Sequence, residues 1–133
     1  MDRVALDTTF LIDLQNERRG RGRKRGALSF LKTHQATELL LPSVVLGEYL
    51  EGFADPDSNE AQAVVSILRV LDVTNTVARV YSQVARSLRL SGQLIGANDL
   101  WIACTALAAQ VPVVTRNVEH FARIPKLNVI AYT

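Results

Sequence analysis

Short apolar runs alternate along this chain with segments of helical periodicity, and this alternation restricts the possible folds more than any other feature. Five runs have the length of a β-strand, and they cover residues 4–6, 39–41, 68–73, 111–115 and 127–132. Helical patterns lie between them, at about residues 8–17, 26–35, 42–52, 60–67, 75–92 and 97–110. Continuous apolar strands that alternate with helices are typical of a parallel sheet covered on both faces. We therefore predict an α/β protein.

Two helix boundaries are marked by particular residues. Pro42 is expected to stop the second strand, and Ser43 is suited to cap the helix that follows. The helix over residues 75–92 repeats valine and leucine at spacings of three and four. We expect it to end near Gly92, because glycine readily adopts the left-handed conformation that closes a helix.

The composition predicts one globular domain over residues 1–133. Apolar residues make up 48% of the chain and aromatic residues 6%, and the mean hydropathy is +0.12, so a disordered chain is excluded. No apolar run is long enough to span a membrane, and the N-terminus lacks a secretory signal pattern. The single cysteine, Cys104, excludes an intramolecular disulfide and a metal site of several cysteines. We expect Cys104 to be buried and the protein to be cytoplasmic.

Six of the fifteen basic residues fall in one glycine-rich segment, residues 18–25: Arg18, Arg19, Arg21, Arg23, Lys24 and Arg25. Nine basic and thirteen acidic residues remain elsewhere, so the rest of the chain carries a net charge of about −4. Because the segment has no apolar residue to anchor it, we expect it to be mobile. Two interpretations stay open, a solvated linker and a loop that contacts phosphate groups.

Acidic and polar residues follow the predicted strands at one edge of the sheet. Asp7 ends the first strand, Glu48 lies in the first turns of the helix after the second, and Asp99 opens the sixth helix. Thr115 and Asn117 come at the end of the fourth strand. Ligands of such sheets bind outside the carboxyl ends of the strands. We therefore expect these side chains to converge.

Each acid also has a purely structural interpretation. Asp99 would be favourable at the positive end of a helix dipole, with Asn98 as the cap, and Glu48 could be an exposed helix residue. Asp7 is harder to explain in this way, since it ends a buried strand beside Thr8 and Thr9. Three converging carboxylates would repel one another unless a cation lay between them. Oxygen ligands without a histidine or cysteine set point to Mg²⁺ or Mn²⁺.

Four segments, taken in chain order, carry a family resemblance: VALDTTFLIDL, LLLPSVVLGEYLEG, LSGQLIGANDLWIACTALA and VVTRNVEHFARIPKLNVI. Together they resemble the PIN domain over nearly the full length, and specifically the VapC-type toxin ribonucleases. The resemblance implies a three-layer α/β/α sandwich with a five-stranded parallel sheet. It also implies an endoribonuclease dependent on Mg²⁺ or Mn²⁺, a homodimer, and an antitoxin whose C-terminal segment blocks the acidic pocket. The implied substrates are structured RNAs, chiefly tRNA anticodon stem-loops or a large-rRNA loop.

The resemblance assigns the core acids of the family to three positions: Asp7, Glu48 and Asp99. Thr115 matches the small hydroxyl residue of the site. At the fourth acidic position, many PIN domains have an acid near Asn117, where this chain has an amide. The alternative residue is Glu119, two positions further on. We favour Asn117, because an amide carbonyl can also bind a metal ion or its water.

The same resemblance suggests roles for the other polar residues. Asp7 and Asp99 are predicted to bind the metal directly, whereas Glu48 is either a third ligand or the base that orients the attacking water. Thr8 and Thr9 are expected to position a water molecule or a phosphate oxygen. The number of metal ions, one or two, stays open.

Two further groups of residues have less specific predictions. His34 and His120 lie in unrelated segments, so we expect surface or packing roles and no acid–base pair. For residues 18–25, the possible partners are the phosphates of RNA and an acidic segment of the antitoxin.

Two other functions compete with the nuclease interpretation. An aspartyl-phosphate phosphohydrolase needs a second aspartate two residues after its nucleophile, and here that residue is Thr9. A catalytically weak PIN-like module that binds RNA or protein is the second alternative, and Asn117 favours it. The three intact acids favour the nuclease.

Overall fold

A five-stranded parallel sheet forms the centre of the protein, in a computed structural model that describes residues 2–133. Every pairing between neighbouring strands is parallel, and each predicted apolar run contains a strand. The predicted parallel sheet is therefore confirmed. The strands, in the spatial order β3-β2-β1-β4-β5, are β1 (Arg3–Leu6), β2 (Glu38–Pro42), β3 (Arg69–Leu71), β4 (Val113–Thr115) and β5 (Val129–Ala131).

The central strand, β1, is paired on both sides. Val4, Ala5 and Leu6 have no exposed surface, as expected for a strand covered on both faces of a parallel sheet. In register, Ala5 lies opposite Leu40 of β2 and Val113 of β4. The chain builds from β1 to β2 and β3, and then returns to the other side of β1 to form β4 and β5. Strand order reverses between β1 and β4, which is where α/β sheets bind ligands.

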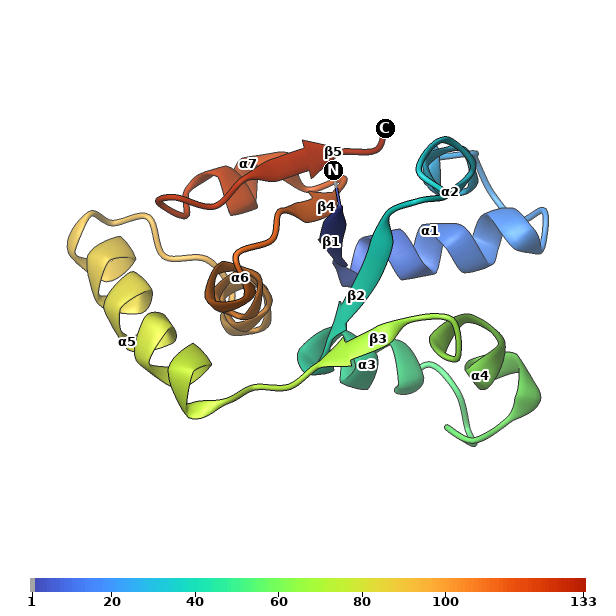
Figure 1. The fold of residues 1–133 in the computed structure, drawn as a ribbon, viewed down its shortest axis with the longest axis horizontal. Helices are drawn as coiled ribbons and strands as arrows, with labels where there is room; N and C mark the ends of the chain where they lie inside the picture. The colour runs from blue at the N-terminus through green and yellow to red at the C-terminus, as the bar shows by residue number, and fades with distance from the viewer. Residues whose placement is uncertain (1) are drawn as a thin grey trace.

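Two layers of helices cover this sheet. Figure 1 shows α1, α2 and α4 on one side and α5, α6 and α7 on the other, so the predicted α/β/α sandwich is confirmed. Six helices were predicted; α7 was missed because one short turn carries no periodic pattern. The helices within residues 2–133 are α1 (Thr8–Arg18), α2 (Ala27–Thr33), α3 (Ser43–Leu50), α4 (Asn59–Val65), α5 (Asn75–Leu90), α6 (Ala97–Ala109) and α7 (Val118–Ala122).

The two predicted helix boundaries have different outcomes. The prediction that Ser43 caps α3 is wrong: Pro42 occupies the cap position, and the Ser43 hydroxyl donates a hydrogen bond to the carbonyl of Leu71 at 2.9 Å. Ser43 therefore links α3 to the edge strand β3. The prediction for α5 is confirmed, since the helix ends at Leu90 and Gly92 follows with a φ of +69°.

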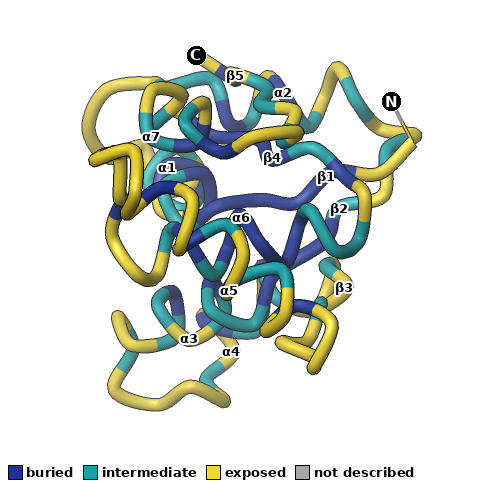
Figure 2. Tube along the Cα trace, turned by 90° about the vertical axis from the view of Figure 1, so that its left-hand side faces the viewer, coloured by how far each residue is buried: buried dark blue, intermediate teal, exposed yellow. Residues whose placement is uncertain are grey.

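The apolar core lies between the sheet and the helices. Figure 2 shows the buried chain running through β1 and α6, while the connecting loops are exposed. Cys104 is buried in α6, as predicted, and burial raises the pKa of its thiol to about 11, so the thiol is unreactive at neutral pH. Among the described residues, no helix has both the length and the apolar character needed to cross a bilayer.

Candidate functional site

Asp7 lies immediately after β1 and caps α1. Its carboxylate accepts hydrogen bonds from the Phe10 backbone N–H at 2.9 Å, from the Thr9 hydroxyl at 2.9 Å, and from the Thr115 hydroxyl at 2.5 Å. Aspartate is favoured at this position because its side chain satisfies a free N–H of the first helical turn. Thr115 ends β4, the neighbour of β1, so the parallel pairing brings the two side chains together. Asp7 is held in one orientation and is only 3% exposed.

The charge on Asp7 is costly in this environment. Burial raises the pKa of the carboxyl, and the nearby charge of Asp99 raises it further. The hydrogen bonds from Thr115, Phe10 and Thr9 act in the opposite direction but do not cancel the effect of burial on the pKa. An ionised Asp7 would be stabilised by a cation at this position.

Glu48 of α3 reaches the same edge of the sheet. The Thr8 hydroxyl donates to its Oε1 at 2.6 Å, and the Asn98 side-chain amide donates to its Oε2 at 3.2 Å. In the purely structural interpretation of Asp99, Asn98 was the cap of α6, but Gly96 occupies that position. Asn98 instead connects the first turn of α6 to Glu48. The first turns of α1 and α6 thus meet the second turn of α3 through polar side chains.

Asp99 interacts electrostatically with both of the other acids. Its pKa is raised by burial and by the charge of Glu48, and the nearby imidazole of His120 opposes this shift. The Nδ1 atom of His120 lies 3.7 Å from Oδ2 of Asp99. Asp99 in turn raises the pKa of Asp7. The three predicted acids therefore form a series in which Asp99 interacts with both neighbours.

Asn117 borders this group through its backbone and its side chain. Its N–H donates to the Thr115 hydroxyl at 2.8 Å, and its amide nitrogen lies 2.9 Å from Nδ1 of His120. Glu119 lies outside the group: its side chain is 86% exposed, and it pairs with Arg123 at 3.5 Å. The carboxylate of Glu119 consequently faces solvent, whereas Asn117 is half-buried.

The two histidines differ in position. His34 stacks on Phe30, with ring centroids 4.1 Å apart, which agrees with the predicted packing role. His120 lies at the surface, with 44% of its side chain exposed, and it also contacts Asn117 and Asp99, which was not predicted. The available signal was the spacing of three residues between Asn117 and His120, which places both on one face of a helical turn. That turn, α7, was itself not predicted.

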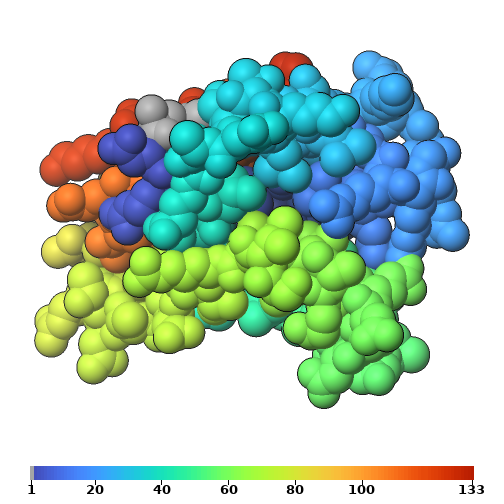
Figure 3. Space-filling model, turned by 45° about the vertical axis from the view of Figure 1, so that its right-hand side comes forward, coloured from blue at the N-terminus to red at the C-terminus, as the bar shows by residue number. Residues whose placement is uncertain are grey.

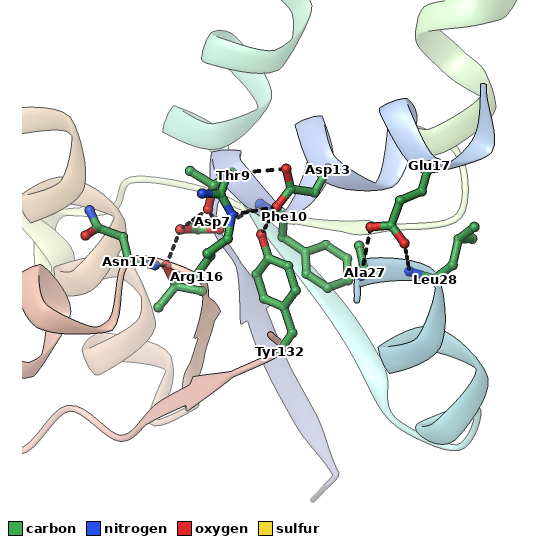
Figure 4. Close-up of polar contacts among 11 residues, drawn as sticks. Asp7, Thr9, Phe10, Asp13, Glu17, Ala27, Leu28, Arg116, Asn117 and Tyr132 are labelled. Carbon is green, nitrogen blue, oxygen red and sulfur yellow. Dashed lines mark hydrogen bonds and ion pairs between the residues drawn. The ribbon is translucent and has the colours of Figure 1, made fainter. Parts of the chain in front are cut away.

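Asp13, a buried acid of α1, has its own cation. Arg116 donates to it from Nε at 2.9 Å and from a terminal nitrogen at 3.3 Å, and the Tyr132 hydroxyl donates at 2.6 Å. Figure 4 shows these side chains beside Asp7 and Asn117. The pairing with Asp13 raises the pKa of Arg116. Arg116 thus neutralises Asp13, and no local sequence pattern indicated this, because its partners lie more than a hundred residues away.

The chemistry of these donors fits a small divalent cation. Asp7 and Asp99 offer carboxylate oxygens and lack an arginine or lysine partner within residues 2–133. In the same part of the chain, no three Asp, Glu, His or Cys side chains are already grouped as a metal site. Mg²⁺ usually keeps several waters and needs only one or two protein carboxylates, so the side chains of Asp7 and Asp99 are of a suitable kind and number for it.

Comparison with known proteins identifies the family. The sequence pattern of the PIN domain matches residues 4–127, which is nearly the whole chain. This chain belongs to the PIN domain family. It is similar to Ribonuclease VapC1 of Haemophilus influenzae strain R2866, with 31% identity over 94 residues that cover 67% of this chain and 70% of the relative.

Two solved structures resemble this PIN domain over its whole length. VapBC-1 from nontypeable Haemophilus influenzae is 29% identical, with a TM-score of 0.75 and 98% of each chain covered. The DNA-bound VapBC from Salmonella typhimurium is 25% identical, with a TM-score of 0.80 and 100% of each chain covered. The predicted PIN-like fold and the resemblance to VapC-type proteins are therefore confirmed.

Proposed function

We propose that this PIN domain, over residues 1–133, is a metal-dependent endoribonuclease that acts as the toxin of a toxin–antitoxin pair. The main support is a contrast between buried acids. Asp13 is neutralised by Arg116, whereas Asp7 accepts hydrogen bonds only from hydroxyl and backbone donors, and its pKa is raised by burial and by the charge of Asp99, at the edge where the strand order reverses. Such a pair is favourable for holding a cation and unfavourable without one.

Asp7 and Asp99 would hold the Mg²⁺ or Mn²⁺ ion, with Glu48 as a third ligand or as the base. When bound, the ion supplies charge neutralisation at the scissile phosphate and makes water more acidic. The hydroxyls of Thr9 and Thr115 keep the Asp7 carboxylate in one orientation.

Proton transfer is best assigned to Glu48. Thr8 occupies its Oε1 with a short bond of 2.6 Å, whereas Oε2 has only the longer bond of 3.2 Å from Asn98. Oε2 is therefore the atom we expect to take the proton of the attacking water. Asn117 supplies the fourth position through its amide, in preference to the exposed Glu119.

The relatives support the class of substrate and the partner. One is named a ribonuclease, and the two similar structures are VapBC assemblies. We expect the substrate to be a structured RNA, such as a tRNA or rRNA loop, and an antitoxin to block the acidic site. We also expect a homodimer that acts in the cytoplasm.

The decisive experiment compares two aspartates at strand ends. Asp7→Asn should reduce Mn²⁺-dependent RNA cleavage by at least about 100-fold, because it removes a ligand charge from the metal site. Asp72→Asn is the matched control, since Asp72 also follows a strand but is exposed, and its cleavage rate should stay at the parental level. Circular dichroism of both variants checks that the fold is intact.

Two results would count against the proposal. Equal cleavage by the parent and Asp7→Asn would show that Asp7 is not a ligand of consequence. A parent protein that cuts no RNA with either Mg²⁺ or Mn²⁺ would favour the alternative, a PIN-like module that binds RNA or protein without strong catalysis.

A further inference from the structure

The segment 18–25, which we call the basic loop, joins the end of α1 to the start of α2. In Figure 3 this part of the chain projects from the edge of the molecule, in the lighter blue at the upper right. Arg18, Arg21, Arg23 and Lys24 are exposed, and Arg25 is half-buried. The basic loop is therefore a strongly charged surface and is separate from the acidic site.

Contrary to expectation, the two ends of the basic loop are anchored. Both carboxylate oxygens of Glu17 accept backbone hydrogen bonds from the first turn of α2, from Ala27 at 3.0 Å and from Leu28 at 3.3 Å. At the other side of the loop, the N–H of Arg21 donates to the carbonyl of Asn16 at 2.8 Å. The missing apolar anchor is thus replaced by a carboxylate that closes the loop.

Glycine is required where the loop meets the C-terminal segment. Gly26 has a φ of +102°, and a side chain at this position would collide with the backbone carbonyl of Tyr132. Gly20 and Gly22 also have positive φ values, of 64° and 66°. These conformations are accessible mainly to glycine, so the turns between the cations depend on it.

Most of the charge in the loop is uncompensated. Arg19 pairs with Glu60 of α4, but the other five cations form no ion pair within residues 2–133. The remainder of the chain is acidic, with nine basic and thirteen acidic residues. The RNA substrate is a polyanion, and its scissile phosphate must enter the acidic site, which repels it. A positively charged surface elsewhere on the protein would offset this repulsion.

We propose that the basic loop contacts the phosphate backbone of the RNA substrate outside the cleavage site; this inference rests on the proposed function. The loop follows α1, whose first residue adjoins Asp7, so the two sites are separated by about 16 Å along this helix. A structured RNA is large enough to reach both. Phosphate contacts of this kind hold the RNA without reading its sequence.

The test uses a quadruple glutamine variant of Arg21, Arg23, Lys24 and Arg25. Binding of a labelled 20-nucleotide RNA hairpin is measured at several salt concentrations in an Asp7→Asn background, so that the probe stays uncut. We expect binding about tenfold weaker at low salt, and a slope of log Kd against log salt that is smaller by about 3.

The matched control removes the same number of cations from the opposite helix layer and the segment after α7, by glutamine at Arg79, Arg86, Arg89 and Lys126. It should change the affinity for the hairpin less than about twofold and leave the salt slope unchanged. If it weakens binding as much as the loop variant, net charge and not the loop attracts RNA, and the proposal is wrong.

Two further outcomes separate this proposal from others. If the loop variant binds the hairpin with unchanged affinity and salt slope, the loop does not contact RNA, even if affinity for an antitoxin is lost. With Asp7 restored, the loop variant should cut at the same sites as the parent. A parent that fails to cut would overturn the proposed function, while the binding measurements would still decide the role of the loop.

Discussion

Asp7 and Asp13 belong to the same short segment and are both nearly buried, with 3% and 6% of their surface exposed. Their surroundings differ in charge. Arg116 neutralises Asp13 and Tyr132 donates a hydrogen bond to it, whereas Asp7 has only hydroxyl and backbone donors and faces the charge of Asp99. A buried carboxylate without a cation is unstable when ionised. At the scale of single residues, this difference separates a structural acid from a candidate metal ligand.

Asp7→Asn should stabilise the metal-free protein at neutral pH. The pKa of Asp7 is raised by burial above its ordinary value of 3.8, so the folded state binds this proton more tightly than the unfolded state. Stability therefore falls as the pH rises through the raised pKa. In EDTA at pH 7 we expect the variant to gain on the order of 1 kcal/mol in urea unfolding, with the gain shrinking toward pH 4. A gain that is equal at both pH values, or one also seen in Asp72→Asn, would contradict this account.

Asn117→Asp should tighten Mn²⁺ binding by about tenfold, because it adds a formal charge beside the candidate ligands. Calorimetric titration of the metal-free protein measures this directly. Glu119→Gln should leave the affinity for Mn²⁺ unchanged, since the Glu119 carboxylate faces solvent. Our preference for Asn117 would be reversed if Glu119→Gln weakened binding more than Asn117→Ala.

At the scale of secondary structure, α2 begins without a cap of its own. Gly26 stands at the cap position and has no side chain to accept a hydrogen bond. Glu17, near the end of α1, supplies both oxygens instead. A negative charge at a helix N-terminus also interacts favourably with the helix dipole. One side chain therefore starts α2 and closes the basic loop.

Glu17→Ala should lower the free energy of unfolding by about 1 kcal/mol, the usual cost of losing an N-cap interaction. Alanine favours helix, so α1 itself should not be weakened by the change. The expected decrease in Tm is about 4 °C. Glu51→Ala is the matched control, because Glu51 is exposed at the end of α3. Equal Tm values for the two variants would show that the Glu17 bonds contribute little.

At the scale of the whole molecule, polar contacts tie together parts of the chain that are far apart in sequence. Asp13 on α1, Arg116 after β4 and Tyr132 after β5 form one polar group, in which Asp13 and Tyr132 are buried and Arg116 is exposed. The group joins the helix layer over β1 to the far edge of the sheet. It borders the candidate metal site, so the position of β4 relative to Asp7 depends in part on it.

Tyr132→Phe should destabilise the protein by about 1 kcal/mol, because it removes a buried hydrogen bond of 2.6 Å to Asp13. Urea unfolding measures this change. Tyr81→Phe is the control: Tyr81 stacks on Trp101, and phenylalanine preserves that stacking. If Tyr132→Phe proves as stable as Tyr81→Phe, the hydrogen bond from Tyr132 to Asp13 contributes nothing measurable to stability.

The sequence by itself determined the strands, six of the helices and the parallel sheet, because apolar periodicity is a local property that each segment carries. It also placed Asp7 and Thr115 at one edge, since parallel strands end on the same side. Which of the two buried acids, Asp7 or Asp13, is paired with a cation depends on the tertiary structure. Asp13 is neutralised by Arg116, 103 positions away, and accepts a hydrogen bond from Tyr132, 119 positions away, and no local pattern indicates such contacts.

The same reason accounts for the other differences. His120 contacts Asp99 across two elements, and Glu17 caps a helix that is not its own. Each of these contacts depends on how the helices pack against the sheet and against one another. Whether a charged side chain is stabilised depends on the neighbours that this packing places beside it. The sequence therefore determined where the candidate site lies, whereas tertiary structure decided which carboxylates remain without a cation there.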